Sequence, residues 1–290
     1  MPTSLANSLY GSPSFPKLVR AFLVDGNMIC AHQQPDHLEA AGRIHPTGTE
    51  NHLQTMVEWV ATFGSNYLIN DVLARTQATS DNLVRVLNRA GIGRTCNIVY
   101  ISGCVIRNFA NDSLTYSTIS DTSEHPIDHP HGINTDYMRT ILLARDSLIL
   151  PNILLVTDVC HLHNFLNLPH VLVFEPDGIP VWRDAIPLNG PGGATWDRPQ
   201  RIVHFACITS RTEGSLSAYH DGRFTREFCS ISANESISLA EHVKQIQRSL
   251  HSATERAVVH VSLVPTLYAC AVTHDLYWIA IFFSPIGRHT

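Results

Sequence analysis

The most informative stretch of this chain is Ile153-Leu-Leu-Val-Thr157-Asp158-Val159-Cys160-His161. Four apolar residues followed by polar ones are typical of a buried parallel strand that emerges at the edge of a sheet. In open α/β sheets, chemistry is located where the strands end. Cys160 stands at such an end, and a thiol becomes a nucleophile there when a base or a cation lowers its pKa. The stretch therefore predicts an α/β fold with a nucleophile at a strand terminus.

Composition and charge narrow the classes of protein to which the chain can belong. Its 290 residues are 44% hydrophobic, which is enough for a sizeable core. A net charge of −5 without a basic run argues against a nucleic-acid partner. The start shows no secretory signal, and the longest late apolar run, 276–283, is too short to cross a bilayer, so we expect no membrane partner. Seven scattered cysteines indicate reduced thiols and a cytoplasmic protein.

Strand and helix patterns alternate along the chain. Residues 1–17 are predicted to form a flexible N-terminal arm, and 18–290 a single domain. Capped amphipathic segments predict helices after Thr47-Gly-Thr-Glu50, Thr79 or Ser80, Asn134 or Thr135, and Ser238. Apolar runs predict strands at 19–24, 67–69, 97–101, 153–159, 171–174, 202–208, 258–264 and 276–283. This order predicts a three-layer α/β sandwich, with a mostly parallel central sheet and helices on both faces.

Several segments between these elements are predicted to be turns and loops. Ser102-Gly103-Cys104 should turn at the end of its strand. Residues 105–132 are polar, and we expect a long mobile loop with solvated His125, His129 and His131. The Gly/Pro-rich segment 188–193 is predicted to be an exposed loop.

Short motifs follow one another in a fixed order and resemble those of the caspase and metacaspase family over roughly residues 18–265. They are Asp25-Gly26-Asn27, Gln77-Ala78-Thr79-Ser-Asp81-Asn82-Leu83, Tyr100-Ile-Ser102-Gly103, Asp158-x-Cys160-His161, Leu166-Asn-Leu168-Pro169-His170, and Ala218-Tyr219 with Gly222-Arg-Phe224-Thr225. The resemblance implies a caspase-like fold and a cysteine endopeptidase that acts on proteins or peptides.

The resemblance also implies roles for single residues. Cys160 is the nucleophile of an acyl transfer, and the backbone N–H groups of Val105 and Cys160 stabilise the oxyanion. Asp158 gives a preference for Arg or Lys, and Ser210 and Arg211 belong to the stretch that binds substrate. The residues predict no cofactor and no metal site, and the resemblance leaves calcium dependence open.

One departure from the family bears on activity. Where the family has its catalytic histidine and a glycine, this chain has Cys104 and Val105. A thiol with an unperturbed pKa near ~8.5 does not act as a persistent cation beside Cys160. Loss of a general base costs on the order of 10²–10⁴ in rate. The sequence therefore predicts a peptidase with impaired catalysis.

Alternative functions stay open beside this one. A non-catalytic caspase-like module would bind a peptide or an active relative, in cell-death or stress signalling. Cys104 and Cys160 would form a redox pair if their Cα atoms lay within about 7 Å. His161 or His163 would be a substitute base, and with Cys160 and His170 they would form a metal site, although the spacing fits no zinc pattern.

Overall fold

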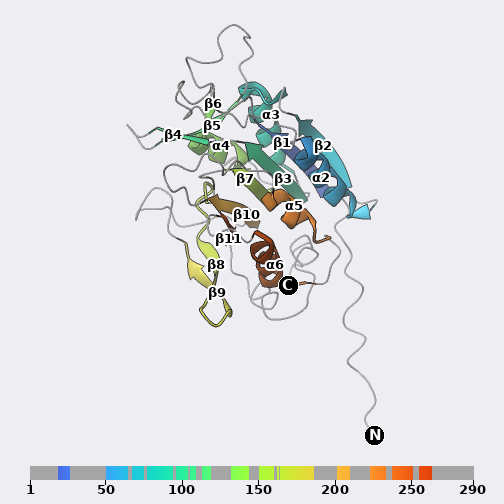
Figure 1. Ribbon diagram of the computed structural model, residues 1–290. Helices are drawn as coiled ribbons and strands as arrows, with labels where there is room; N and C mark the ends of the chain where they lie inside the picture. The colour runs from blue at the N-terminus through green and yellow to red at the C-terminus, as the bar shows by residue number, and fades with distance from the viewer. Residues whose placement is uncertain are drawn as a thin grey trace, which may run out of the picture.

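The structure is a computed structural model of the chain, and its central feature is an eight-stranded sheet (Figure 1). The order of its strands is β2-β1-β3-β7-β10-β11-β8-β9. The residues that the structure describes are 19–26, 50–64, 67–74, 77–93, 96–103, 105–108, 113–118, 132–143, 150–159, 162, 164–185, 201–209, 223–232, 237–250 and 255–262.

Five neighbouring strands of the sheet run parallel, and three follow in antiparallel order. The parallel strands are β2 (Tyr67–Leu73), β1 (Val19–Asp25), β3 (Cys96–Gly103), β7 (Asn152–Val159) and β10 (Ile202–Thr209). The antiparallel ones are β11 (Glu255–Val261), β8 (His170–Phe174) and β9 (Pro180–Asp184). Four consecutive apolar residues form the middle of β3, Ile98 to Ile101, and of β7, Ile153 to Val156, because both faces of the sheet are covered. The predicted mostly parallel sheet is confirmed.

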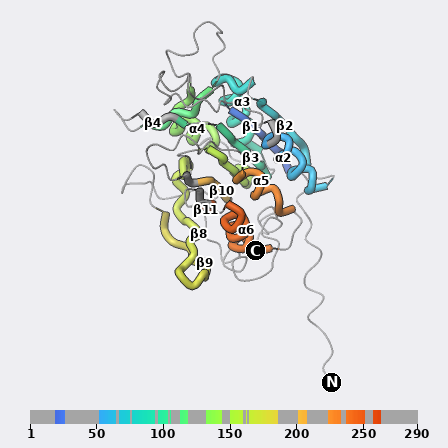
Figure 2. Tube along the Cα trace, viewed as in Figure 1, coloured from blue at the N-terminus to red at the C-terminus, as the bar shows by residue number. Residues whose placement is uncertain are grey.

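Helices cover both faces of the sheet and enclose a separate hydrophobic core on each. One core contains residues of α2 (Glu50–Ala61), α5 (Arg223–Cys229) and α6 (Leu239–Leu250), and we call this side the α5 face. The other contains residues of α3 (Ser80–Ala90) and α4 (Thr135–Leu142), and we call it the α3 face. Figure 2 shows the same arrangement as a tube. The predicted three-layer sandwich is therefore confirmed.

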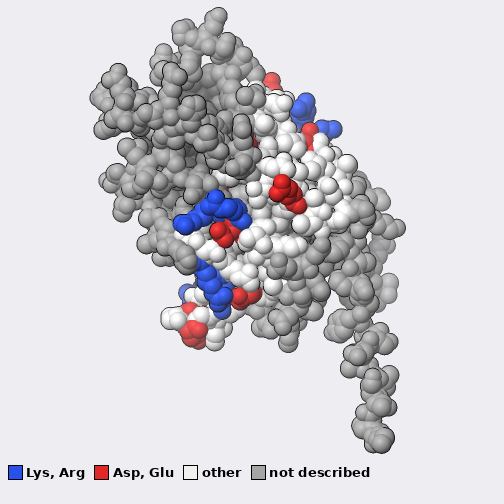
Figure 3. Space-filling model, turned by 45° about the vertical axis from the view of Figure 1, so that its right-hand side comes forward, with Lys and Arg blue, Asp and Glu red and all other residues white. Residues whose placement is uncertain are grey.

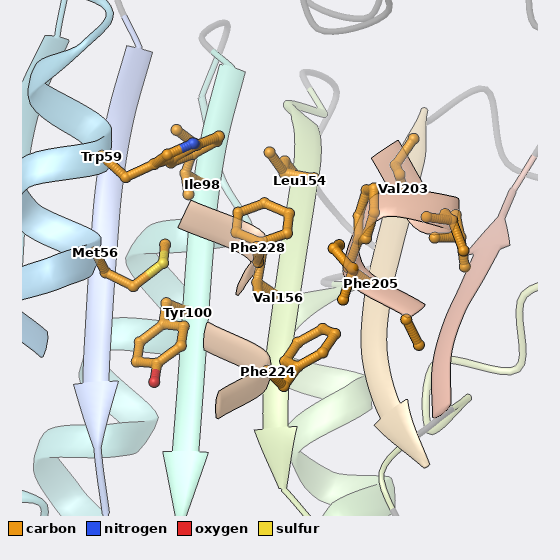
Figure 4. Close-up of a cluster of buried hydrophobic side chains, with 14 of the residues drawn as sticks. Met56, Trp59, Ile98, Tyr100, Leu154, Val156, Val203, Phe205, Phe224 and Phe228 are labelled. Atoms are coloured by element: carbon orange, nitrogen blue, oxygen red, sulfur yellow. The ribbon is translucent and has the colours of Figure 1, made fainter. Parts of the chain in front are cut away.

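Aromatic side chains fill the core of the α5 face. Trp59 of α2 packs against Phe228 of α5, with ring centroids 4.9 Å apart. Phe228 also packs against Phe205 of β10 at 5.1 Å. In Figure 4, Tyr100 and Phe224 lie toward the arrowheads of the strands, whereas Trp59 lies toward their starts. The α5 helix is thus anchored over the central strands β3, β7 and β10.

The described helix starts agree with the predicted caps. Thr79 Oγ1 accepts a hydrogen bond from the Asn82 N–H at 3.3 Å, which caps α3. Asn134 Oδ1 caps α4 at the N–H of Asp136, 2.8 Å away, and Ser238 Oγ caps α6 at the N–H of Glu241, 3.1 Å away. The predicted cap before Glu50 lies outside the described residues.

The prediction of one long loop over residues 105–132 was wrong for two of its parts. β4 (Val105–Asn108) pairs with β5 (Ser113–Ser117), and β5 pairs with β6 (Gly132–Asn134) in a small antiparallel sheet. In β5, Leu114 and Tyr116 are buried between half-buried Ser113 and Thr115. Their alternation is the period of a strand with one covered face, and the polar composition masked it. The predicted solvated histidines 125, 129 and 131 lie outside the described residues.

Other boundaries also differ from the prediction. The strand expected at 97–101 continues through Ser102 to Gly103, so the predicted turn does not begin at Ser102. Helix α5 and strand β9 were not predicted at all. The N-terminal arm 1–17, the loop 188–193 and the strand 276–283 lie outside the described residues. Within the described part of the chain, no helix is long and apolar enough to span a membrane.

Strand β2 ends one side of the described sheet, and its pairing with β1 contains a bulge. Ala21 pairs with Ile69 and Phe22 with Asp71, which leaves Asn70 as an extra residue between the two pairs. Arg20 Nε donates a hydrogen bond to Asn70 Oδ1 at 3.2 Å. This contact holds the bulge residue against the neighbouring strand.

Candidate functional site

Three polar side chains form a row across neighbouring strands at the carboxyl end of the parallel sheet. Asp25 of β1 pairs in register with Ser102 of β3, and Ser102 pairs with Asp158 of β7. All three point to the α5 face, because side chains alternate along a strand and Tyr100 and Val156 belong to the core on that face. We call these three residues the acidic row. Each of them is at most 3% exposed, so the row is a buried polar feature.

Ser102 is the centre of the hydrogen bonds on the β1 side of the acidic row. Its Oγ donates to Asp25 Oδ1 at 2.7 Å. Its carbonyl oxygen accepts from the Tyr116 hydroxyl at 2.6 Å and from the Gly26 N–H at 2.9 Å. Tyr116 belongs to β5, so the small antiparallel sheet is tied to the end of β3 by this contact.

Two glycines make room for the Tyr116 phenol. A Cβ atom on Gly26 would lie 2.0 Å from the Tyr116 hydroxyl oxygen, closer than any real contact. A Cβ atom on Gly103 would lie 2.9 Å from the same oxygen, and Gly103 has a φ of +142°, which L side chains rarely adopt. The glycines of the Asp25-Gly26 and Ser102-Gly103 motifs are therefore required by close packing at the strand ends.

Helix α5 donates two hydrogen bonds to Asp158. Thr225 Oγ1 donates to Asp158 Oδ2 at 2.6 Å, and the Thr225 N–H donates to the same oxygen at 3.3 Å. The Tyr100 hydroxyl lies 2.9 Å from Thr225 Oγ1. Because a hydroxyl has one proton and Thr225 gives its own to Asp158, Tyr100 is the donor to Thr225.

Burial and the two carboxylates of the acidic row determine the protonation of the phenols and the thiol that lie near them. The pKa of Tyr100 is raised well above its usual value, first by burial and then by the charge of Asp158. Burial, followed by the charge of Asp25, likewise raises the pKa of Tyr116. The pKa of the Cys229 thiol is raised by burial and by Asp158. The two phenols therefore stay protonated donors, and Cys229 stays a thiol rather than a nucleophile.

The described surface has a different electrostatic character from the row. In the view of Figure 3, basic and acidic side chains lie close to one another on the described surface. Ion pairs of this kind include Arg89 Nη1 with Asp71 Oδ1 at 2.9 Å and Arg248 with Glu241 at 3.3 Å. Such exposed pairs contribute little, about 0–1 kcal/mol each. The acidic row instead gathers two carboxylates in a place screened from water.

Most of the remaining predicted site residues cannot be placed from the described part of the chain. Cys104, Cys160, Ser210 and Arg211 lie outside the described residues. The residues that precede the two cysteines, Gly103 and Val159, are register partners on neighbouring strands. Val105 begins β4, is 3% exposed and pairs with Tyr116. The catalytic, oxyanion and substrate-binding roles of these residues stay predictions.

The described histidines that are buried in the sheet region make contacts away from the acidic row. His204 Nε2 lies 2.8 Å from Thr157 Oγ1, on the α3 face, because Thr157 alternates with Asp158 along β7. The His260 ring lies 6.3 Å from that of His204. His242 of α6 stacks on Phe228, and its Nε2 lies 3.3 Å from the Phe228 carbonyl oxygen. A substitute base for Cys160 stays a prediction, because Cys160, His161 and His163 lie outside the described residues.

A metal site finds no support in the part of the chain that the structure describes. No group of three His, Cys, Asp or Glu side chains there is arranged to hold a metal ion. Of the predicted ligands, Cys160, His161 and His163 lie outside the described residues. His170 Nδ1 lies 3.5 Å from Asp184 Oδ1 in the β8–β9 hairpin.

Four residues of the site were missed by sequence reasoning. Asp25, Tyr100 and Thr225 enter the sequence analysis only as parts of family motifs, and Tyr116 does not enter it at all. Asp25 could have been recognised from the sequence as a candidate site residue, because it stands at the end of an apolar strand, as Asp158 does within one residue. The contacts of Tyr116 and Thr225 depend on β5 and α5, two elements that the sequence pattern did not predict.

Comparisons with solved structures include two distant likenesses. No protein-family model and no curated protein matches the chain. Protein GSU0716 from Geobacter sulfurreducens aligns over 86% of this chain and 95% of its own, with a TM-score of 0.47 and 13% identity. The Drosophila initiator caspase Dronc aligns over 93% of this chain and 86% of its own, with a TM-score of 0.45 and 11% identity. Likeness at these values does not carry the activity of either protein to this chain.

Proposed function

We propose that this chain is a caspase-like cysteine peptidase domain that binds an Arg or Lys side chain of a peptide or protein and cleaves after it slowly or not at all. The family motifs around Ser102-Gly103 and Asp158-x-Cys160 support the class, and the acidic row supports the preference for a basic residue.

The acidic row is the observation on which the proposal depends. Two carboxylates on either side of a hydroxyl are the natural complement of a guanidinium or ammonium group, which forms charge-assisted hydrogen bonds with them. Asp158 stands two residues before Cys160, and Ser102 stands two before Cys104. A basic side chain at the row would therefore bind next to the candidate nucleophile along the chain. Since the side chains of the acidic row are at most 3% exposed, the carboxyl end of the parallel sheet must open before a basic side chain can reach them.

Weak or absent cleavage follows from the residue at the position of the family histidine. In an acyl transfer, the imidazole takes the thiol proton and returns it to the leaving amine. Cys104 offers no imidazole for either step. This arrangement favours a second candidate function, a non-catalytic module that binds a basic peptide or an active caspase-like relative.

Binding and cleavage are tested separately on the same peptides. One peptide carries Arg at the tested position, and its matched partner carries norleucine, which has a similar length and no charge. We expect the Arg peptide to bind at least about tenfold more tightly, which corresponds to about 1.4 kcal/mol. Asp25→Asn and Asp158→Asn should each remove that preference, whereas Asp184→Asn, at a side chain that is 98% exposed, should keep it.

Turnover is measured near neutral pH with and without calcium, beside a Cys160→Ala control. We expect little or no cleavage of Arg and Lys peptides by the unmodified chain. Robust cleavage that disappears in Cys160→Ala would show a full peptidase with another base. Equal affinity for the Arg and norleucine peptides would refute the basic-residue site.

A further inference from the structure

Helix α5 reaches into the acidic row through a single residue. Thr225 is fully buried, and both of its hydrogen-bond donors, Oγ1 and N–H, are directed at one oxygen of Asp158, at 2.6 and 3.3 Å. The neighbouring Phe224 and the later Phe228 fix the helix in the core of the α5 face. A two-point contact from a fixed helix determines the orientation of the Asp158 carboxylate.

The hydroxyl of Tyr100 supports the contact between Thr225 and Asp158. Tyr100 donates to Thr225 Oγ1 at 2.9 Å, which leaves the Thr225 proton pointing at Asp158. Hydrogen bonds in such a chain polarise and strengthen one another. Donors to a buried carboxylate favour its charged form, whereas a buried carboxylate that lacks them tends to take up a proton.

We propose that Thr225 is a positioning residue that orients Asp158 and keeps it charged for binding a basic side chain, with Tyr100 as its support. This inference rests on the proposed function of the acidic row and assigns part of its specificity to α5. The Phe224-Thr225 motif, which had no role in the predicted mechanism, gains one. The contact also means that binding of a basic residue requires α5 in its packed position.

Matched substitutions separate the hydroxyl from the shape of the side chain. Thr225→Val removes the hydroxyl, keeps the volume and leaves the backbone N–H in place. Thr225→Ser keeps the hydroxyl and loses a methyl group. Tyr100→Phe removes the supporting donor. Thr140→Val serves as a control at an exposed residue of α4, where the hydroxyl donates to the Asp136 carbonyl oxygen of its own helix.

The first readout is the affinity of each variant for the Arg and norleucine peptides. At pH 7 we expect Thr225→Val to weaken Arg-peptide binding about tenfold or more, as for loss of a hydrogen bond to a charged group, with norleucine binding unchanged. Thr225→Ser and Thr140→Val should bind like the unmodified chain, and Tyr100→Phe should show a smaller loss. An unchanged Arg affinity in folded Thr225→Val would overturn the proposal.

The second readout needs no peptide and tests the contact itself. Denaturation midpoints are measured for Thr225→Val, Asp158→Asn and the double variant, which form a double-mutant cycle. We expect clear coupling, with Thr225→Val lowering the midpoint less when Asp158 is already Asn. Additive effects would show that the two side chains do not interact, and would overturn the inference alone. Coupling in a chain that does not prefer the Arg peptide would refute the proposed function and, with it, the role of Thr225 in specificity.

Discussion

Acid should destabilise this fold through His242, a histidine buried in the core of the α5 face. Its ring stacks on Phe228 at 5.1 Å and lies 5.2 Å from Phe205, and its Nε2 lies 3.3 Å from a carbonyl oxygen. Burial lowers its pKa from 6.5 to about 4, although the hydrogen bond to the Phe228 carbonyl works in the opposite direction. The neutral ring is therefore the form that the folded chain requires.

The sign and size of the effect follow from linkage between protonation and folding. Below pH 6.5 the unfolded chain takes up a proton at this residue, whereas the folded chain does so only near pH 4. The contribution of His242 to stability is thus complete above pH 6.5 and declines as the pH falls toward 4. Each tenfold difference in proton affinity is worth about 1.4 kcal/mol, so the full loss is about 3 kcal/mol.

Urea denaturation at several pH values between 7 and 4 measures this loss. The unmodified chain should lose about 3 kcal/mol more than His242→Leu over that range, because the variant has no proton to take up at this position. Val243→Ala, at the next buried residue of α6, should lower the free energy of unfolding by a similar amount at every pH. If His242→Leu keeps the full pH dependence of the unmodified chain, the reasoning about this histidine is wrong.

Three further changes have defined outcomes. The double variant Cys104→His with Val105→Gly should cleave Arg and Lys peptides measurably in a fluorogenic turnover assay, and faster than either single variant. The reason is that the two changes restore the family's base and its neighbouring glycine. A double variant without activity would show that the defect lies at another position. Gly26→Ala should lower stability by about 1–3 kcal/mol in thermal or urea unfolding, because its methyl group would lie 2.0 Å from a phenol oxygen. Asn164→Ala should lower the free energy of unfolding by about 1–3 kcal/mol in the same assay, because the Asn164 side-chain amide hydrogen bonds with both the N–H and the carbonyl oxygen of buried Leu168. An unchanged midpoint would contradict that account.

The central strands were predictable because their residues are apolar on both faces. A short apolar run such as Ile153-Leu-Leu-Val156 is typical of a buried parallel strand, and the caps at Thr79, Asn134 and Ser238 were predictable from single side chains. The small sheet β4-β5-β6 escaped prediction because its strands are short and partly polar. Helix α5 has only 7 residues, which is too few for a clear helical period.

The candidate site was predictable only in part, for reasons of register. Asp158 was found through its motif, but Asp25 and Ser102, which hydrogen bond to each other, are 77 residues apart in the chain. Their contact depends on how β1 is aligned with β3, and one residue of slip would turn one of the side chains to the α3 face. No local pattern fixes that alignment, so the acidic row emerged only from the paired strands.

The bulge at Asn70 has a consequence for behaviour at high concentration. An end strand with a straight, regular backbone is a template on which a strand of another molecule can pair. In β2 the regular pairing with β1 runs only from Tyr67 to Ile69 and from Asp71 to Leu73, with the kink between them. Leu68 and Val72 are 49% and 38% exposed, and on a flat strand they would favour such pairing. The kink instead makes this end of the sheet a poor partner for a second strand and so protects the folded chain from edge-to-edge aggregation there.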